Sequence, residues 1–239
     1  MLRLLALTLL GLCLAFPAPA DEARIYLSSH APHGLAGADS SLVWACGDTT
    51  RVDTLYLSFD PGRACTTFVA MSANLWFHAL TGDSLSGLWA PVGAYGPPRG
   101  IKVEYGPGSA SDPPSPWQSF GAGLVAYVRP SRTAGMLRLV YAVPPQGGAT
   151  VEAGRRYSFA RVLLRRPAAG TPGCDQPVCV EWLEANMAYS IQDNPKITEG
   201  VKYVGLNTAS GLYGCVSPPA STQSRATFEE QGYNTLYLA

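Results

Sequence analysis

Apolar side chains stand at every second position from Val69 to Ala79, while Ser72, Asn74 and His78 occupy the positions between them. This alternation is the pattern of a half-buried β-strand, because successive strand residues point to opposite faces of a sheet. The other apolar runs are short and are separated by turn-forming residues, among the 25 Gly and 20 Pro of the chain. The sequence therefore predicts many short strands and no long helix.

The expected strands define an all-β fold. They cover residues 23–27, 54–59, 67–79, 101–105, 123–128, 136–143, 157–164, 179–191 and 201–206. About nine or ten strands with frequent turns predict a two-sheet sandwich, jelly-roll or immunoglobulin-like, with a closed barrel as the alternative. Residues 81–120 are rich in Gly, Pro, Ser and Asp, which predicts a loop-rich insertion in the sandwich.

The first twenty residues resemble a secretory signal peptide. Arg3 precedes an uncharged apolar run that ends at Phe16, and Ala18-Pro19-Ala20 is a small-residue cleavage site. We therefore expect a signal peptide at 1–20, a sandwich at 21–206 and a partly linker-like extension at 207–239. The predicted location is secreted or periplasmic, and no later stretch is apolar enough to form a transmembrane segment.

Charge argues against one class of partner. Lys and Arg together number 17, as do Asp and Glu, and no basic stripe occurs. Nucleic acid is therefore not an expected partner. The absence of an Asn-x-Ser/Thr sequon is consistent with a bacterial protein.

Five cysteines follow the expected cleavage site, and in an oxidising compartment most of them should pair. Cys46 and Cys65 flank an expected hairpin and are the first predicted pair. The second pair is drawn from Cys174, Cys179 and Cys215, with Cys179 and Cys215 as the expected bridge. The spacing of Cys174 and Cys179, with no His nearby, is a poor match to a zinc site. No metal or cofactor is expected.

The segment Gly82-Asp83-Ser84-Leu85-Ser86 matches the nucleophile block of the GDSL esterase family. A serine hydroxyl needs a base to become a nucleophile, and in that family a His in a later block supplies it. All three histidines here, His30, His33 and His78, precede Ser84. A hydrolase that uses Ser84 is therefore the disfavoured alternative, and the chain is predicted not to be an enzyme.

Aromatic residues in the loop-rich insertion are the candidate ligand-binding residues: Trp89, Tyr95, Tyr105 and Trp117. Exposed rings on loops of a rigid β-scaffold could stack on a polysaccharide. The alternative is that the rings fold back to cover one end of a sheet. Trp44, Trp76 and Trp182 fall on expected strands, which indicates packing roles.

Three strand segments carry a resemblance to cohesin-like domains, secreted β-sandwiches akin to carbohydrate-binding modules. They are Thr54 to Pro61, Met136 to Ala142 and Tyr157 to Val162. The resemblance spans about Ala23 to Ser190 and implies the sandwich fold and a general extracellular binding role. Cohesins bind dockerin modules, but the cysteines, the insertion and the extension depart from their pattern, so no binding residue is carried over.

The sequence thus predicts a non-catalytic extracellular binding module. Its partner is either a polysaccharide held by loop aromatics or a protein held by a sheet face or an exposed edge. One further observation is that Asn234-Thr235-Leu236-Tyr237-Leu238 echoes Asp53-Thr54-Leu55-Tyr56-Leu57.

Overall fold

The computed structural model describes residues 22–44, 46–90, 92, 96–117, 121–189, 193–208 and 215. Within these ranges the chain forms fourteen strands and two single 3₁₀ turns. The strands are β1 (Arg24–Ser29), β2 (Ser41–Leu42), β3 (Val52–Asp60), β4 (Cys65–Phe68), β5 (Ala70–Ala79), β6 (Ile101–Tyr105), β7 (Ala122–Val128), β8 (Ala134–Ala142), β9 (Ala149–Val151), β10 (Tyr157–Arg165), β11 (Val178–Ala188), β12 (Lys196–Ile197), β13 (Gly200–Val201) and β14 (Tyr203–Leu206). The predicted all-β class is confirmed.

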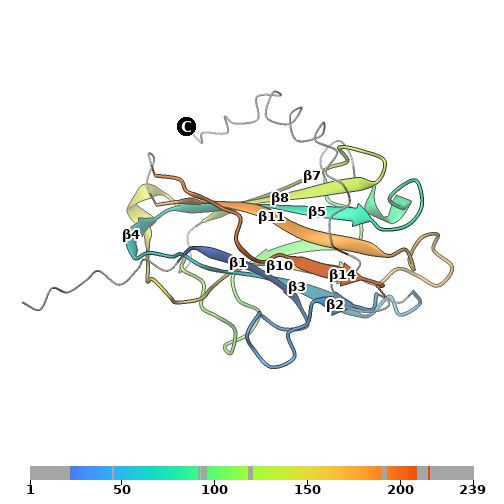
Figure 1. The fold of residues 1–239 in the computed structure, drawn as a ribbon, viewed down its shortest axis with the longest axis horizontal. Coiled ribbons are helices and arrows are strands. Elements are labelled where there is room, and N and C mark those ends of the chain that lie inside the picture. The colour runs from blue at the N-terminus through green and yellow to red at the C-terminus, as the bar shows by residue number, and fades with distance from the viewer. Residues whose placement is uncertain are drawn as a thin grey trace, which may run out of the picture.

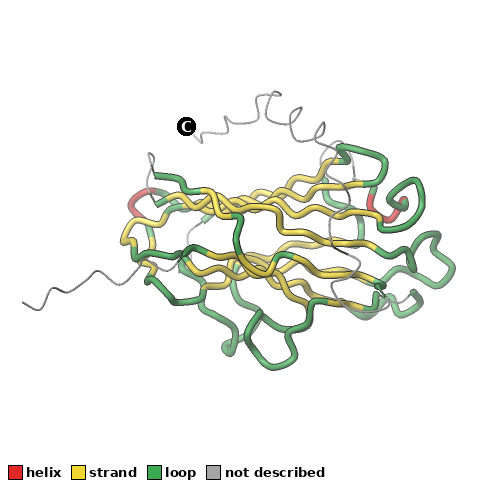
Figure 2. Tube along the Cα trace, in the orientation of Figure 1, coloured by secondary structure: helices red, strands yellow, loops and turns green. Residues whose placement is uncertain are grey.

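Two main sheets form the sandwich. One has the order β13-β1-β3-β10-β6, and the other has the order β2-β14-β11-β5-β8-β7 with β12 also paired to β11. A third, two-stranded sheet joins β4 to β9. Figure 1 shows β5, β8 and β11 in one layer and β1, β3 and β10 in the other, and Figure 2 shows loops gathered at both ends of the strands. The strand count exceeds the predicted nine or ten because several strands have only two residues.

Strand β5 shows how alternation sets the core. Its residues alternate between half-buried and buried, and Met71, Ala73, Leu75 and Phe77 are at most 1% exposed. These side chains face the inner side of the opposite sheet, where Leu55 and Phe59 of β3 are fully buried. The same alternation leaves polar residues on the outer face of β5. The sandwich core therefore follows from period two in the sequence.

The insertion at 81–120 is loop-rich, as expected, and contains one strand, β6, at the edge of the five-stranded sheet. Its 3₁₀ turn at Gly87–Trp89 brings Trp89 inward, and the loop after β6 brings Trp117 inward. The insertion thus covers the ends of the sandwich with aromatic side chains.

The predicted division into 1–20, 21–206 and 207–239 stays a prediction. Residues 1–21 and nearly all of the extension lie outside the described residues. Asn207 is described, and its side chain accepts a hydrogen bond from the backbone N–H of Trp44 and donates one to the carbonyl of Cys174. Asn207 is therefore bonded to the sandwich, as is Cys215 through its disulfide with Cys179. No helix in the described part of the chain is long and apolar enough to cross a membrane.

Candidate functional site: cysteines, sheet face and a bare edge

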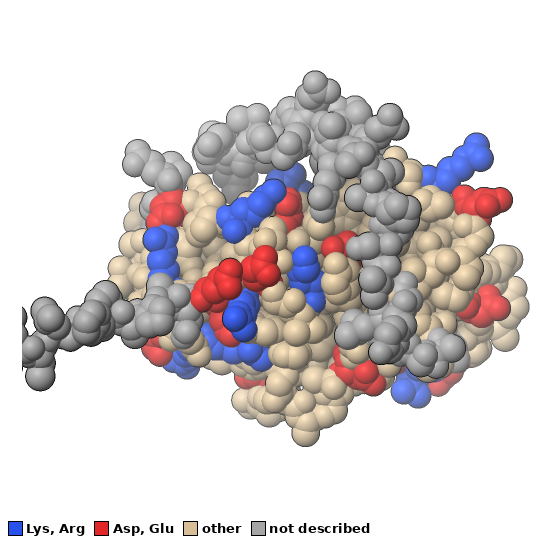
Figure 3. Space-filling model, viewed as in Figure 1, with Lys and Arg blue, Asp and Glu red and all other residues tan. Residues whose placement is uncertain are grey.

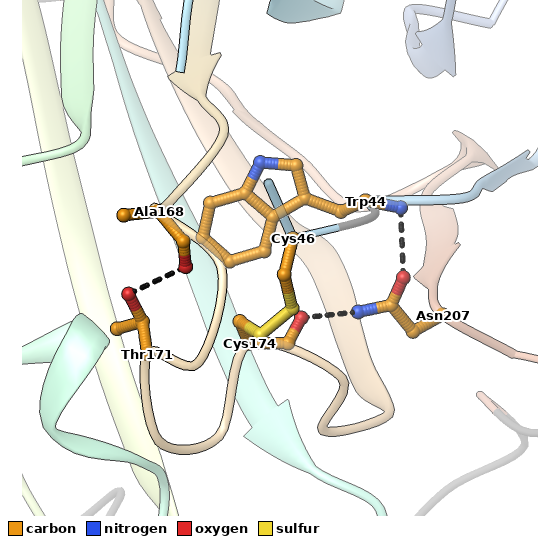
Figure 4. The surroundings of a disulfide bond; sticks show 6 residues. All are labelled: Trp44, Cys46, Ala168, Thr171, Cys174 and Asn207. Carbon is orange, nitrogen blue, oxygen red and sulfur yellow. Dashed lines mark hydrogen bonds between the residues drawn. A yellow bond between two sulfur atoms is a disulfide. The ribbon is translucent and has the colours of Figure 1, made fainter. Parts of the chain in front are cut away.

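The Cys46–Cys174 disulfide corrects the predicted pairing of Cys46 with Cys65. Cys46 precedes β3 and Cys65 follows it, so the nine residues of β3, about 30 Å of strand, hold the two residues at opposite ends of the sandwich. Cys174 instead lies in the loop before β11, with its Cα 5.8 Å from that of Cys46. Figure 4 shows this disulfide beside Trp44 and Asn207.

The expected pair of Cys179 and Cys215 is present, with a Cα–Cα distance of 5.3 Å. Cys179 lies on β11 directly opposite His78 of β5, on the outer face of the seven-stranded sheet. Cys215 is therefore tied to that outer face. Among the cysteines that the structure describes, only Cys65 has a free thiol; it is half-buried, and its sulfur accepts a hydrogen bond from the N–H of Thr67.

The loop aromatics are not exposed platforms. Trp89 is 1% exposed and packs against Phe77, and Trp117 is 7% exposed and stacks on Phe68. An indole ring inside the core presents no face to a sugar, so the expectation of exposed rings is wrong for both tryptophans. The alternative, that these rings cover a sheet end, fits their positions. The Gly- and Pro-rich sequence around them had indicated a surface loop, but the loop folds back onto the sandwich.

The other two candidate aromatics differ from each other. Tyr105, on β6, is half-buried between Tyr141 and Phe159, and its hydroxyl donates a hydrogen bond to the carbonyl of Leu124 on β7. Burial raises the pKa of the Tyr105 phenol. Tyr105 therefore joins the edges of the two sheets. Tyr95 lies outside the described residues.

The segment that contains Ser84 is a surface turn fastened by Gln176. The Gln176 side-chain amide donates to the carbonyls of Thr81 and Ser84 and accepts the N–H of Ser86. Two of the three histidines are engaged elsewhere: His33 stacks on Tyr26, and His78 faces Glu181. In the described ranges, no three His, Cys, Asp or Glu side chains gather closely enough to hold a metal ion.

A connected polar network occupies the outer face of the seven-stranded sheet. The His78 Nε2 atom lies 3.7 Å from Glu181 Oε2, and the Tyr203 hydroxyl donates to Glu181 Oε1. Burial pushes the pKa of Glu181 upward, but hydrogen bonds from His78 and Tyr203 and the charge of Lys202 outweigh it and hold that pKa below its ordinary value. The ring of Trp76 lies parallel to that of His78, at a centroid distance of 5.6 Å.

A second part of the network lies along the same face. Glu184 accepts a hydrogen bond from the Asn74 amide and forms an ion pair with Lys196, whose Nζ lies 2.6 Å from Glu184 Oε2. The outer face thus has its own internal partners for its charged groups. Figure 3 shows Lys and Arg interspersed with Asp and Glu over the view that it draws. The alternation in the sequence indicates a polar outer face. Which polar side chains become partners depends on the register between neighbouring strands, which the alternation does not show.

The edge at β7 is the least protected part of the two main sheets. Among the described residues, β7 pairs with β8 on one side and with no strand on the other. Its sequence, AGLVAYV, holds no charged residue and no proline, and Leu124 is 51% exposed. Natural proteins usually protect such an edge with charge, proline, a bulge or a cover, because unpaired backbone groups can pair with another chain.

The hydrogen-bond register shows which β7 groups are unpaired. The N–H of Val143 donates to Val69 and the N–H of Ala79 donates to Thr133, so the odd-numbered residues of β8 bond to β5. The backbone N–H and C=O groups of successive residues in an antiparallel strand point to opposite neighbouring strands, so the even-numbered residues of β8 bond to β7. These residues face Ala122, Leu124, Ala126 and Val128. The N–H and C=O groups of Gly123, Val125 and Tyr127 therefore point away from β8. Gly123 is exposed and Val125 is half-buried, whereas Tyr127 is fully buried, so the open part of the edge lies at Gly123 and Val125.

The other four outer strands of the main sheets are protected in different ways, and β12, with two residues, is too short to template a longer strand. Strand β6, at the edge of the five-stranded sheet, carries Lys102 and Glu104, which form an ion pair at 2.7 Å. Strands β13 and β2 have two residues each, too few to template a longer strand. Within the described ranges, β7 is thus the one long, uncharged edge of the sandwich.

The architecture is a two-sheet β-sandwich with two disulfides among the described residues. No protein-family model matches the chain, and no curated protein matches it. Among solved structures, the chain is similar to the second type II cohesin module from the cellulosomal adaptor ScaA scaffoldin of Acetivibrio cellulolyticus. The two share 10% identity with a TM-score of 0.38, and the match covers 79% of this chain and 98% of that one. Cohesins are also the family that the sequence resembles.

Proposed function

We propose that this chain is a non-catalytic extracytoplasmic module that binds an extended segment of a protein partner along β7. The observation that carries the proposal is the edge at Gly123 and Val125, whose outward-facing backbone groups have no strand partner in the described part of the chain. A strand-like segment that adds to this edge would satisfy those groups with ladder hydrogen bonds. Selectivity would come from the side chains of the added strand, at alternate positions on the two faces.

Two features support the location. The structure pairs four cysteines in two disulfides, and such bonds persist in oxidising compartments. The expected signal peptide at 1–20 agrees with this, although it lies outside the described residues. The half-buried thiol of Cys65 is compatible with the same compartment, because burial limits its access to oxidants.

A protein partner is favoured over a polysaccharide by the position of the rings. The polysaccharide version depended on exposed Trp89 and Trp117, and both lie in the core. Of the five tryptophans, Trp44 and Trp182 are also buried, and Trp76 is half-buried beside His78. The four buried indoles therefore offer no exposed face of the kind that the sugar version needs.

The proposal can be tested with peptides. A random peptide library is selected against the chain, and the best binder is titrated by fluorescence anisotropy against two matched variants. Val125→Pro removes an edge-facing N–H from β7. Val103→Pro removes an edge-facing N–H from β6. The N–H of Gly106 bonds to the carbonyl of Phe159, so the even-numbered residues of β6 bond to β10 and the odd-numbered ones face outward.

We expect Val125→Pro to weaken binding by about fivefold, since one net hydrogen bond contributes about 1 kcal/mol. Val103→Pro should leave the affinity unchanged. Equal affinity for the wild type and Val125→Pro would contradict the proposal, provided that circular dichroism shows both to be folded. Loss in Val103→Pro alone would place the binding surface on β6 instead.

A further inference from the structure

We propose that residues 234–238 of this same chain are a ligand of the β7 edge and compete there with a protein partner. This inference rests on the proposed function, because it concerns the same edge. Residues 234–238 lie outside the described residues, so the argument starts from their sequence, from the anchor at Cys215 and from the edge itself.

The sequence of the segment suits strand addition. Thr235-Leu236-Tyr237-Leu238 is identical to Thr54-Leu55-Tyr56-Leu57, which forms the middle of β3. Residues 234–238 carry no charge, as β7 does not, so neither strand presents a charge to be desolvated in the pair. The residues between 216 and 233 include two prolines and several charged residues, which are typical of a linker.

The anchor fixes where the linker starts. Cys215 is bonded to Cys179 on β11, and the sheet order β11-β5-β8-β7 puts a strand added beyond β7 four strand spacings away. At about 4.8 Å per spacing this is about 19 Å across the sheet. Cys179 stands level with Ala134 of β8, and Val125 stands level with Leu139. The offset along the strands is five residues (139 − 134), or about 17 Å, so the total separation is about 25 Å.

The linker length matches this separation. Residues 216–233 number eighteen (233 − 216 + 1). A flexible chain of that length has a root-mean-square span of about 21–25 Å. A tether whose span matches the distance to its site gives an effective concentration of the order of millimolar. The tethered segment would therefore exclude any partner that binds the β7 edge only weakly. A tighter partner would need a higher concentration to occupy the edge.

Hydrogen exchange read by mass spectrometry tests the inference on the full chain. The comparison is with a variant that ends at residue 231 and keeps Cys215, and with Leu236→Pro, which removes one ladder donor from the segment. We expect the amides of Gly123 and Val125 to exchange about tenfold or more slowly in the full chain than in either variant. The β6 peptide, residues 101–105, should exchange equally in all three.

A synthetic peptide of residues 232–239, added to the shortened variant, should restore protection of β7. Equal exchange at β7 in the full and shortened chains would overturn the inference. Protection that disappears on dilution, with a dimer seen by light scattering, would also overturn it, because the strand would then come from a second copy.

The two proposals fail in distinguishable ways. If the library peptide binds the shortened variant and the β7 amides behave alike in both chains, the partner site stands and the inference about residues 234–238 falls. If β7 is protected in the full chain and no library peptide binds the shortened variant, the segment is an intrinsic strand of the fold and the proposed function falls.

Discussion

Removing the Cys46–Cys174 disulfide should be the most destabilising single change to the covalent framework. The bond joins residues 128 positions apart, whereas Cys179–Cys215 spans 36. In the chain-entropy account, the loss of free energy of unfolding on opening a loop is about 4.9 kcal/mol for the longer loop and about 3.8 kcal/mol for the shorter one. The expected difference between the two bonds is therefore about 1 kcal/mol.

Neighbouring contacts should keep the native geometry when this bond is absent. Asn207 links the Cys174 carbonyl to the backbone of Trp44, and Arg166 bonds to Asp53 through two nitrogens. Because these contacts hold the two chain segments in place, the lost stability should arise from the greater freedom of the unfolded chain. The native near-ultraviolet circular dichroism should stay unchanged.

The assay is urea unfolding followed by tryptophan fluorescence, with Cys65→Ser in every chain to prevent thiol exchange. The pair Cys46→Ser and Cys174→Ser is compared with the pair Cys179→Ser and Cys215→Ser. A loss under about 1 kcal/mol for the first pair would refute the reasoning, as would a larger loss for the second pair. A changed native spectrum would show that the bond shapes the folded state.

Three further outcomes test the packing and charge described above. Gly135→Ala should lower the stability by about 1–3 kcal/mol in the same urea assay, because a Cβ there would overlap the hydroxyl of the buried Tyr127. Asp53→Asn should cost about 3–5 kcal/mol, since it leaves the Arg166 charge, whose side chain is 10% exposed, without its carboxylate. The lowered pKa of Glu181 means that its contribution is present above its ordinary value of 4.5 and is lost as pH falls through the lower folded value. Stability measured from pH 6 to pH 3 should therefore fall less steeply for Glu181→Gln than for the wild type.

The strands could be predicted because their burial is periodic. In β5, alternate residues enter the core, and the sequence shows this directly. Strand β11 departs from simple alternation. A register shift between Trp182 and Glu184 lets Trp182 and Ala185 both face the core, although they stand three residues apart. Simple alternation, counted back from Met187 and Ala185, places Leu183 in the core, but the structure leaves that residue half-buried.

The candidate residues were harder to predict than the strands. Trp89 and Trp117 sit among Gly, Pro and Ser, a composition that correlates with exposure, yet a large ring in a loop gains most free energy by covering the open end of a sandwich. The pairing of Cys46 depended on knowing that a strand as long as β3 separates it from Cys65. Both errors arise because local sequence does not specify which distant segment a loop will cover.

The bare edge is a property of pairing order, which alternation does not encode. The segment AGLVAYV would be an ordinary interior strand if another strand lay beyond it, and its lack of charge would then need no explanation. Only the order β11-β5-β8-β7 makes it an outer strand. The other edges are protected, since β6 carries an ion pair and β2 and β13 have only two residues each. The edge at β7 is an exception to this pattern. A sequence typical of an interior strand suits an outer position if another strand pairs with that edge only after the sandwich has folded.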